Sequence, residues 1–93
     1  MLEKPKNKIG VERYFQNSNF YLSAFLFAKG LELVSVDKIT DPRRAQFVFR
    51  DTPERMIWLE DYNFAKEDTS GAMVDVRKFV TAIKMLKDKL YQE

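Results

Sequence analysis

The side chains best suited to chemistry in this sequence are carboxylates that stand close together in the chain. The residues that could coordinate Mg²⁺ or act as general acid and base are the pairs Glu60-Asp61 and Glu67-Asp68, with Asp51 and Glu54. Adjacent residues of a helix, such as Glu60 and Asp61, point apart. Asp51 and Glu54 instead suit the start of a helix. We therefore interpret these carboxylates as solvated structural groups and predict no metal site.

Other catalytic templates lack their essential residues. The sequence contains no His and no Cys, so the commonest general base, the commonest metal ligand and the thiolate nucleophile are all absent. The three glycines, Gly10, Gly30 and Gly71, lie too far apart to form a loop that cradles phosphate. We predict that the chain is not an enzyme and binds no cofactor.

Basic side chains make nucleic acid a candidate ligand. The net charge is only +2, but residues 51–68 carry six acids and two bases, whereas residues 29–50 and 75–93 each sum to +2. The candidate phosphate contacts are Arg43, Arg44, Arg50, Arg77, Lys78 and Lys84. The alternative is that these side chains only keep a small domain in solution, and no helix-turn-helix or RNA-recognition signature favours nucleic acid.

Aromatic residues indicate a further role, which is self-association. The segment 19–29 is apolar on nearly all sides, so as a helix it must be covered on more than one face. The candidate interface residues are Tyr21, Phe25, Trp58 and Tyr62. Alternatively, three helices and a small sheet bury all of them. We predict a non-enzymatic binding domain that self-associates or binds another protein, with a nucleic-acid-binding accessory domain as the alternative function.

The chain has no membrane signal. Residues 1–8 are polar, and no stretch approaches the ~20 apolar residues that cross a bilayer, so we expect a cytoplasmic location. Residues 1–10, with three Lys, one Pro and one Gly, predict a flexible basic tail. Residues 11–93 predict a single domain. A chain of this length buries only about 60 to 70% of the surface that its unfolded form exposes, which disfavours a second core.

The first half of the chain predicts a helix followed by a hairpin. Ser18 or Asn19 suits the cap of a helix over 19–29 that ends at Gly30. Residues 31–38 and 44–50 alternate like strands, and Asp41-Pro42 marks the turn between them. Residues 11–16 are a candidate third strand, which would pair at the edge of this sheet.

The second half of the chain predicts two helices. Asp51-Thr52-Pro53-Glu54 predicts the start of a helix over 53–65, whose expected buried side is Met56, Trp58, Leu59 and Tyr62. A loop is expected over 67–72, and Asp75 suits the cap of a helix over 75–91. The expected buried stripe of this helix is Val76, Phe79, Val80, Ile83, Leu86 and Leu90. The whole pattern predicts an α+β fold in which a small antiparallel sheet packs against three helices.

Three strings of residues also have a familiar pattern. They are Asn19–Gly30, Phe47–Thr52, and the segment from Val74–Phe79 to Leu86-Lys87. Over residues 13–91 the chain resembles a family of small bacterial and phage domains of unknown function. That pattern often has Asp where this chain has Asn19, and either residue caps a helix. The resemblance implies no activity and assigns no residue a functional role.

Overall fold

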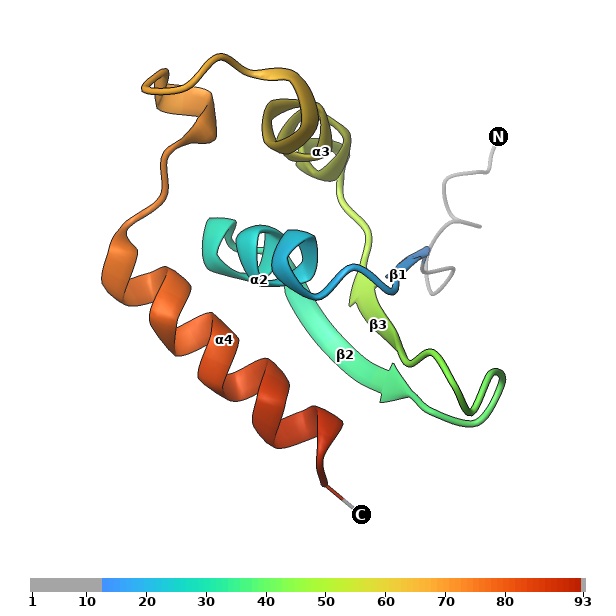
Figure 1. The fold of residues 1–93 in the computed structure, drawn as a ribbon. Helices are drawn as coiled ribbons and strands as arrows, with labels where there is room; N and C mark the ends of the chain where they lie inside the picture. The colour runs from blue at the N-terminus through green and yellow to red at the C-terminus, as the bar shows by residue number, and fades with distance from the viewer. Residues whose placement is uncertain (1–12, 93) are drawn as a thin grey trace, which may run out of the picture.

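The computed structural model describes residues 13–92, which form one three-stranded sheet and three helices (Figure 1). The elements in chain order are β1 (Tyr14–Asn17), α2 (Phe20–Lys29), β2 (Glu32–Asp37), β3 (Gln46–Arg50), α3 (Pro53–Phe64), the 3₁₀ turn η1 (Ser70–Ala72) and α4 (Val76–Leu90). The strand order is β1-β3-β2, and both neighbouring pairs are antiparallel. The expected α+β fold and its third strand are thus confirmed. The tail expected over residues 1–10 lies outside the described residues.

The side chains of the central strand β3 show which face of the sheet packs against the core. Its residues Phe47 and Phe49 are 2% and 0% exposed, and both belong to the core. Phe15 of β1 and Leu33 of β2 stand opposite Phe49, and Val36 stands opposite Phe47, so these side chains share the core face. The residues that alternate with them form the other face.

One detail of β2 corrects the sequence-based prediction. Simple alternation over residues 31–38 would place Val34 and Val36 on the same side of the strand. The register with β3 shifts between Leu33 and Ser35, so an extra residue is inserted there as in a β-bulge. Consequently Val34 is 40% exposed, whereas Leu33 and Val36 both pack against the core.

Helix α2 is the centre of the core and has the expected ends. The side-chain oxygen of Asn19 accepts a hydrogen bond from the Leu22 N–H at 3.1 Å, which satisfies one of the free donors of the first turn. The helix ends at Gly30, whose φ of +124° suits glycine, and the N–H groups of Gly30 and Leu31 close on the Leu26 carbonyl. Five consecutive residues, from Leu22 to Leu26, are buried.

Helix α4 packs along α2, and its cap is the expected one. The Asp75 carboxylate accepts the N–H groups of Arg77 and Lys78 at 2.8 and 3.3 Å. Ala82 and Leu86 are the buried residues of this helix. The buried side of the helix therefore differs from the expected stripe. Val76 is 70% exposed and Val80 is 43% exposed, because both lie on the side of the helix away from Ala82.

Helix α3 corrects the prediction most clearly, because none of its residues is buried. Its expected buried side chains Met56 and Tyr62 are 60% and 37% exposed, whereas Trp58 and Leu59 are partly buried against the core. The helix also lacks the expected side-chain cap: Thr52 occupies the cap position without such a bond. The loop after α3 contains η1, which the sequence did not indicate.

Candidate interaction surfaces

The Asp51 carboxylate anchors α3 to the sheet. Arg55, one turn into α3, donates Nε and Nη2 hydrogen bonds to the two Asp51 oxygens, each at 2.9 Å. The Arg55 guanidinium also lies 4.4 Å from the centre of the Phe15 ring on β1. Hydrogen bonding to Arg55 lowers the pKa of Asp51, and the same bond raises the pKa of Arg55. This pair joins the N-terminus of α3 to β1.

The other acidic residues do not gather into a metal site. Within residues 13–92, no group of three or more acidic side chains is arranged to hold a metal ion. Asp61 lies against Gly71 of η1, where an added Cβ would come within 2.8 Å of the Asp61 carboxylate. The Asp61 side chain therefore packs against the loop that follows α3.

Ser35 and Lys38 have the spacing of a Ser-x-x-Lys nucleophile and base. Ser35 lies within β2, whereas Lys38 follows the last residue of that strand, Asp37. The Lys38 ammonium donates to the carbonyl oxygens of Leu90, at 3.0 Å, and Gln92. Lys38 thereby caps the C-terminal end of α4 instead of facing Ser35.

The hairpin connection between β2 and β3 is organised by two aspartates. The Asp37 carboxylate accepts the N–H of Ile39 and both the N–H and the hydroxyl of Thr40, at 2.7 to 3.1 Å. The Thr40 hydroxyl contributes most to lowering the pKa of Asp37. Asp41 accepts the Arg43 N–H at 3.0 Å. These bonds fix the backbone that carries the exposed basic residues of the connection.

The six candidate phosphate contacts do not form one patch. Arg43 and Arg44 line a hollow of about 440 Å³ beside the C-terminal end of α4. Arg77 and Lys78 occupy the first turn of α4, and thirteen residues separate Arg77 from Leu90, which corresponds to about 20 Å along the helix. Lys84 is exposed between these ends.

Arg50 lies at a third place, on the outer face of the sheet. Its Nε donates to Glu32 on the neighbouring strand at 3.0 Å, and its guanidinium lies 5.9 Å from the centre of the Tyr14 ring. The cross-strand register explains this row, because Tyr14 and Glu32 both stand opposite Arg50. Arg50 is thus engaged within the sheet.

The four candidate interface residues have different surroundings. Tyr21 is 58% exposed, Tyr62 is 37% exposed, and Trp58 packs partly against the core. Phe25 is only 4% exposed, so its assignment to a surface contact is corrected by its place in the core. The Phe25 and Tyr62 ring centres are 5.3 Å apart, which joins α2 to α3.

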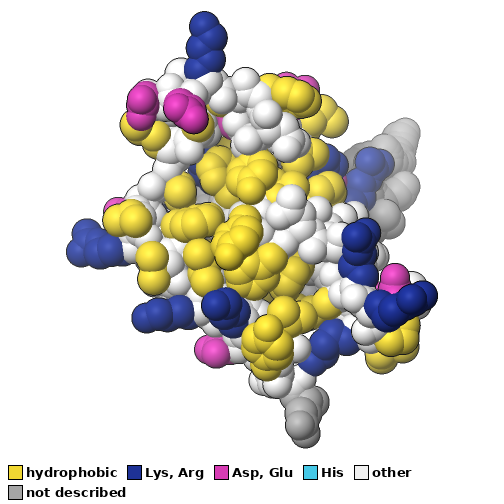
Figure 2. Space-filling model, in the orientation of Figure 1, with side chains coloured by type: hydrophobic (Ala, Val, Ile, Leu, Met, Phe, Trp, Pro, Cys, Tyr) yellow, Lys and Arg dark blue, Asp and Glu magenta, His cyan; other side chains and the backbone are white. Residues whose placement is uncertain are grey.

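The helices expose large apolar side chains that the sequence-based prediction missed or placed in the core. Those on α3 and α4 with at least 37% exposure are Met56, Ile57, Tyr62, Phe64, Val76, Val80 and Met85. Figure 2 shows hydrophobic side chains gathered in a broad area where α2, α3 and α4 meet, with Lys and Arg along α4. Contiguous apolar surface of this kind marks a site of interaction.

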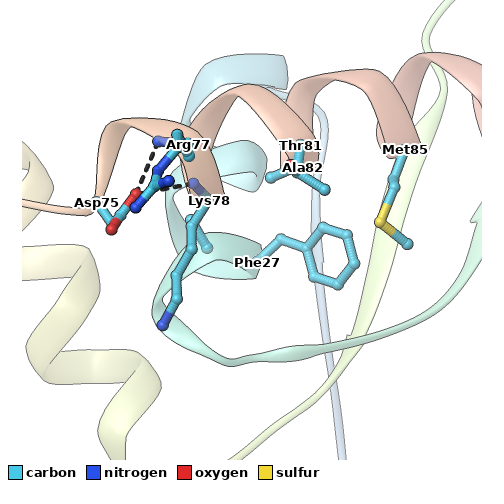
Figure 3. Close-up of a pocket in the computed structure, with 8 residues that line it drawn as sticks. Phe27, Asp75, Arg77, Lys78, Thr81, Ala82 and Met85 are labelled. Atoms are coloured by element: carbon cyan, nitrogen blue, oxygen red, sulfur yellow. Dashed lines mark hydrogen bonds between the residues drawn. The ribbon is translucent and has the colours of Figure 1, made fainter.

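A second hollow, of about 590 Å³, opens between α2 and α4 (Figure 3). It is lined by Phe27, Ala28, Asp75, Arg77, Lys78, Thr81, Ala82 and Met85. Figure 3 shows Phe27 from α2 and Met85 from α4 on facing sides of this hollow, with Lys78 projecting beside them. The hollow therefore combines an apolar floor with Asp75, Arg77 and Lys78 at one end, where two positive charges stand beside one negative charge.

Comparison with known proteins places the chain in a family. Residues 12–92 match the family described as Domain of unknown function (DUF5659). The chain belongs to this family. The searches of curated proteins and of solved structures each found no match. Family membership thus confirms the resemblance noted in the sequence and assigns no function to any residue. Within the described residues, no helix is long and apolar enough to span a bilayer.

Some of these surface residues could have been found from the sequence. Ile57 and Phe64 are seven residues apart, so they share one side of α3, whereas Trp58 and Tyr62 share another. Acidic residues lie between these two apolar sides. A single core can bury only one side of such a helix, so the other apolar side stays exposed. That pattern indicates an interaction surface on α3.

Proposed function

We propose that this chain is a non-enzymatic interaction module that self-associates through the apolar surface of its helices. The observation that carries the proposal is that α3 has no buried residue and yet exposes Ile57 and Phe64, at 61% and 81%. Large apolar side chains gain roughly 1.5–3 kcal/mol each when they move from water into a packed environment. The exposed side chains of α3 therefore favour association.

A stable contact needs only a small part of the surface of the chain. A standard interface buries about 800 Å² on each partner, which is roughly an eighth of the 6759 Å² that this chain exposes. The net charge of +2 is small, so two copies repel each other only weakly. The exposed rings of Tyr21 on α2 and Tyr62 on α3 add the amphipathic area that is typical of interface cores.

Light scattering with size-exclusion chromatography tests the proposal. We expect the mass to rise from one chain of 11.0 kDa towards two as the concentration increases from about 1 to 100 µM, the range that Kd values of transient contacts span. Phe64→Ser should shift this transition to higher concentration. The matched control is Ile39→Ser, because Ile39 is 89% exposed in the hairpin connection and belongs to none of the three helices. A single-chain mass throughout would refute self-association.

Nucleic-acid binding is the second candidate, and one observation favours it. Arg43 and Arg44 line the same hollow as Tyr91, which is 76% exposed, and Lys38 stands there as well. Exposed aromatic rings beside cations are the usual platform for stacking single-stranded bases. Single-stranded DNA of about 12 nucleotides, at 50 and 200 mM salt, tests this candidate. We expect salt-sensitive binding that Arg43→Ala/Arg44→Ala weakens; no binding at 50 mM would rule it out.

A further inference from the structure

We infer that α3 of one copy docks into the hollow between α2 and α4 of a second copy. This inference rests on the proposed self-association and names the two surfaces that meet. The occupant is the exposed side of α3, which carries Ile57 and Phe64. The receiving surface is the hollow of about 590 Å³ shown in Figure 3.

The hollow is long enough to receive the apolar pair of α3. Ile57 and Phe64 are seven residues apart on α3, which is two helical turns or about 10.5 Å. The residues of α4 that line the hollow run from Asp75 at its cap to Met85, ten residues or about 15 Å. Two side chains at the spacing of Ile57 and Phe64 can therefore both lie within one hollow, next to Phe27.

The charged parts of the two surfaces are opposite in sign. Glu54 and Glu60 are exposed one turn from Ile57, on either side of it, and Arg77 and Lys78 border the hollow. Within residues 13–92, none of these four side chains has an ion pair or a side-chain hydrogen bond. The segments that contain these side chains also differ in the sign of their net charge. Residues 51–68 carry six acids and two bases, whereas residues 75–93 carry five bases and three acids.

The position of Arg77 and Lys78 strengthens this pairing. They occupy the first turn of α4, where the helix dipole is positive and cations are unfavourable. The Asp75 carboxylate at the cap offsets this only in part, because it is one negative charge beside two positive ones. An acidic helix placed across this turn would relieve that repulsion as well as pair with the two side chains. The charge pattern thus selects an acidic, apolar helix as the occupant.

The chain's own α3 cannot be that helix. In the same chain, α3 contacts α2 through Tyr62 and Phe25, whose ring centres are 5.3 Å apart. Phe27, which lines the hollow, is two residues from Phe25 and therefore points about 200° away from it around α2. A second copy supplies an α3 without this constraint. Because each chain has both surfaces, a two-fold arrangement forms the contact twice.

A charge-reversal series on the full chain tests the contact by light scattering. The variants are Arg77→Glu/Lys78→Glu, Glu54→Lys/Glu60→Lys, and the combination of all four changes. We expect each double variant to raise the dissociation constant at least tenfold, because both occupant and hollow then carry the same sign. The combined variant should regain association, as should an equimolar mixture of the two double variants, because opposite charges then meet again.

Controls separate this contact from self-association in general. Arg43→Glu/Arg44→Glu makes the same charge change at the hairpin connection and should leave the dissociation constant within twofold of wild type. Circular dichroism checks that each variant is folded, and Phe64→Gln, at an 81% exposed position, provides an uncharged test of the same contact. If wild type associates but neither double variant nor Phe64→Gln weakens it, the contact is wrong and self-association stands. If wild type is monomeric at 100 µM, both are wrong.

Discussion

Arg55 offers the sharpest test of how α3 is held in place. Since no residue of α3 is buried, the helix depends on the partial packing of Trp58, Leu59 and Tyr62 and on the Arg55 side chain. Arg55 contacts both Asp51 and Phe15. Replacing Arg55 by Ala removes both contacts. We expect the change to destabilise the fold and to weaken self-association, because α3 carries the exposed apolar residues.

The expected magnitude follows from the geometry of Arg55. Hydrogen bonds to charged groups contribute about 1.5–3 kcal/mol when shielded, whereas exposed ion pairs contribute about 0–1 kcal/mol. The Arg55 and Asp51 side chains are 20% and 19% exposed, so about 1–2 kcal/mol is appropriate for the pair. The contact with the Phe15 ring adds about 0.5–1 kcal/mol. Arg55→Ala should therefore lower the free energy of unfolding by about 2 kcal/mol.

The same pair makes stability depend on pH. Its hydrogen bonds lower the folded-state pKa of Asp51 below the ordinary value of 3.8, so the unfolded chain binds a proton more readily. The stabilisation is present above the unfolded pKa and is lost as the pH falls through the folded pKa. The stability difference between wild type and Arg55→Ala should be full at about pH 7 and shrink below about pH 4.

Urea denaturation at a series of pH values measures both effects. Asp51→Asn and the double variant complete a mutant cycle, and Arg55→Lys is the matched control that keeps the charge but loses the two parallel bonds. The reasoning would be refuted by a coupling free energy below about 0.3 kcal/mol between Asp51 and Arg55. It would also be refuted by a stability difference that grew on acidification.

Three further substitutions test the core and its boundaries by urea denaturation. Leu86→Ala should cost about 2–5 kcal/mol because Leu86 is fully buried, and a cost below about 1 kcal/mol would contradict its place in the core. Val80→Ala should change stability by no more than about 1 kcal/mol, since Val80 is 43% exposed. A loss as large as that of Leu86→Ala would mean that Val80 is buried, as the sequence predicted. Gly30→Ala should cost more than about 1 kcal/mol because its φ of +124° strains any other residue, so an unchanged midpoint would contradict the turn geometry.

The elements of the fold were predictable because each has a local signal. Asn19 and Asp75 accept backbone N–H groups at the starts of their helices, and Gly30 takes the positive φ that ends α2. Phe47 and Phe49 alternate along β3 and are both buried. Helix caps, helix-terminating glycines and strand alternation each depend on a few neighbouring residues, so they can be recognised from the sequence alone.

Burial and the candidate sites depended on contacts that the sequence does not contain. Val80 fits an apolar stripe, but α2 covers α4 from the side of Ala82, so Val80 remains exposed. Arg43 and Arg77 both looked like phosphate contacts, but they lie at opposite ends of α4. The pairing of Asp51 with Arg55 replaced the expected cap because Arg55 reaches both Asp51 and the ring on β1.

Self-association should protect α3 more than the rest of the fold. A helix without buried residues opens locally at low cost, so its backbone N–H groups exchange with solvent readily in a single chain. When α3 docks on a second copy, each opening of α3 must also break that contact. Binding at 100 times the dissociation constant adds about 2.7 kcal/mol, which corresponds to about 100-fold slower exchange.

Hydrogen exchange at about 1 and 100 µM distinguishes this from a contact made elsewhere. We expect exchange in α3 to slow with concentration, while exchange around the buried Leu86 of α4 changes only as far as the global stability does. The Glu54→Lys/Glu60→Lys variant should lose the concentration dependence in α3. Slowing that is uniform across the chain, or confined to the hairpin connection, would mean that α3 is not the element that docks.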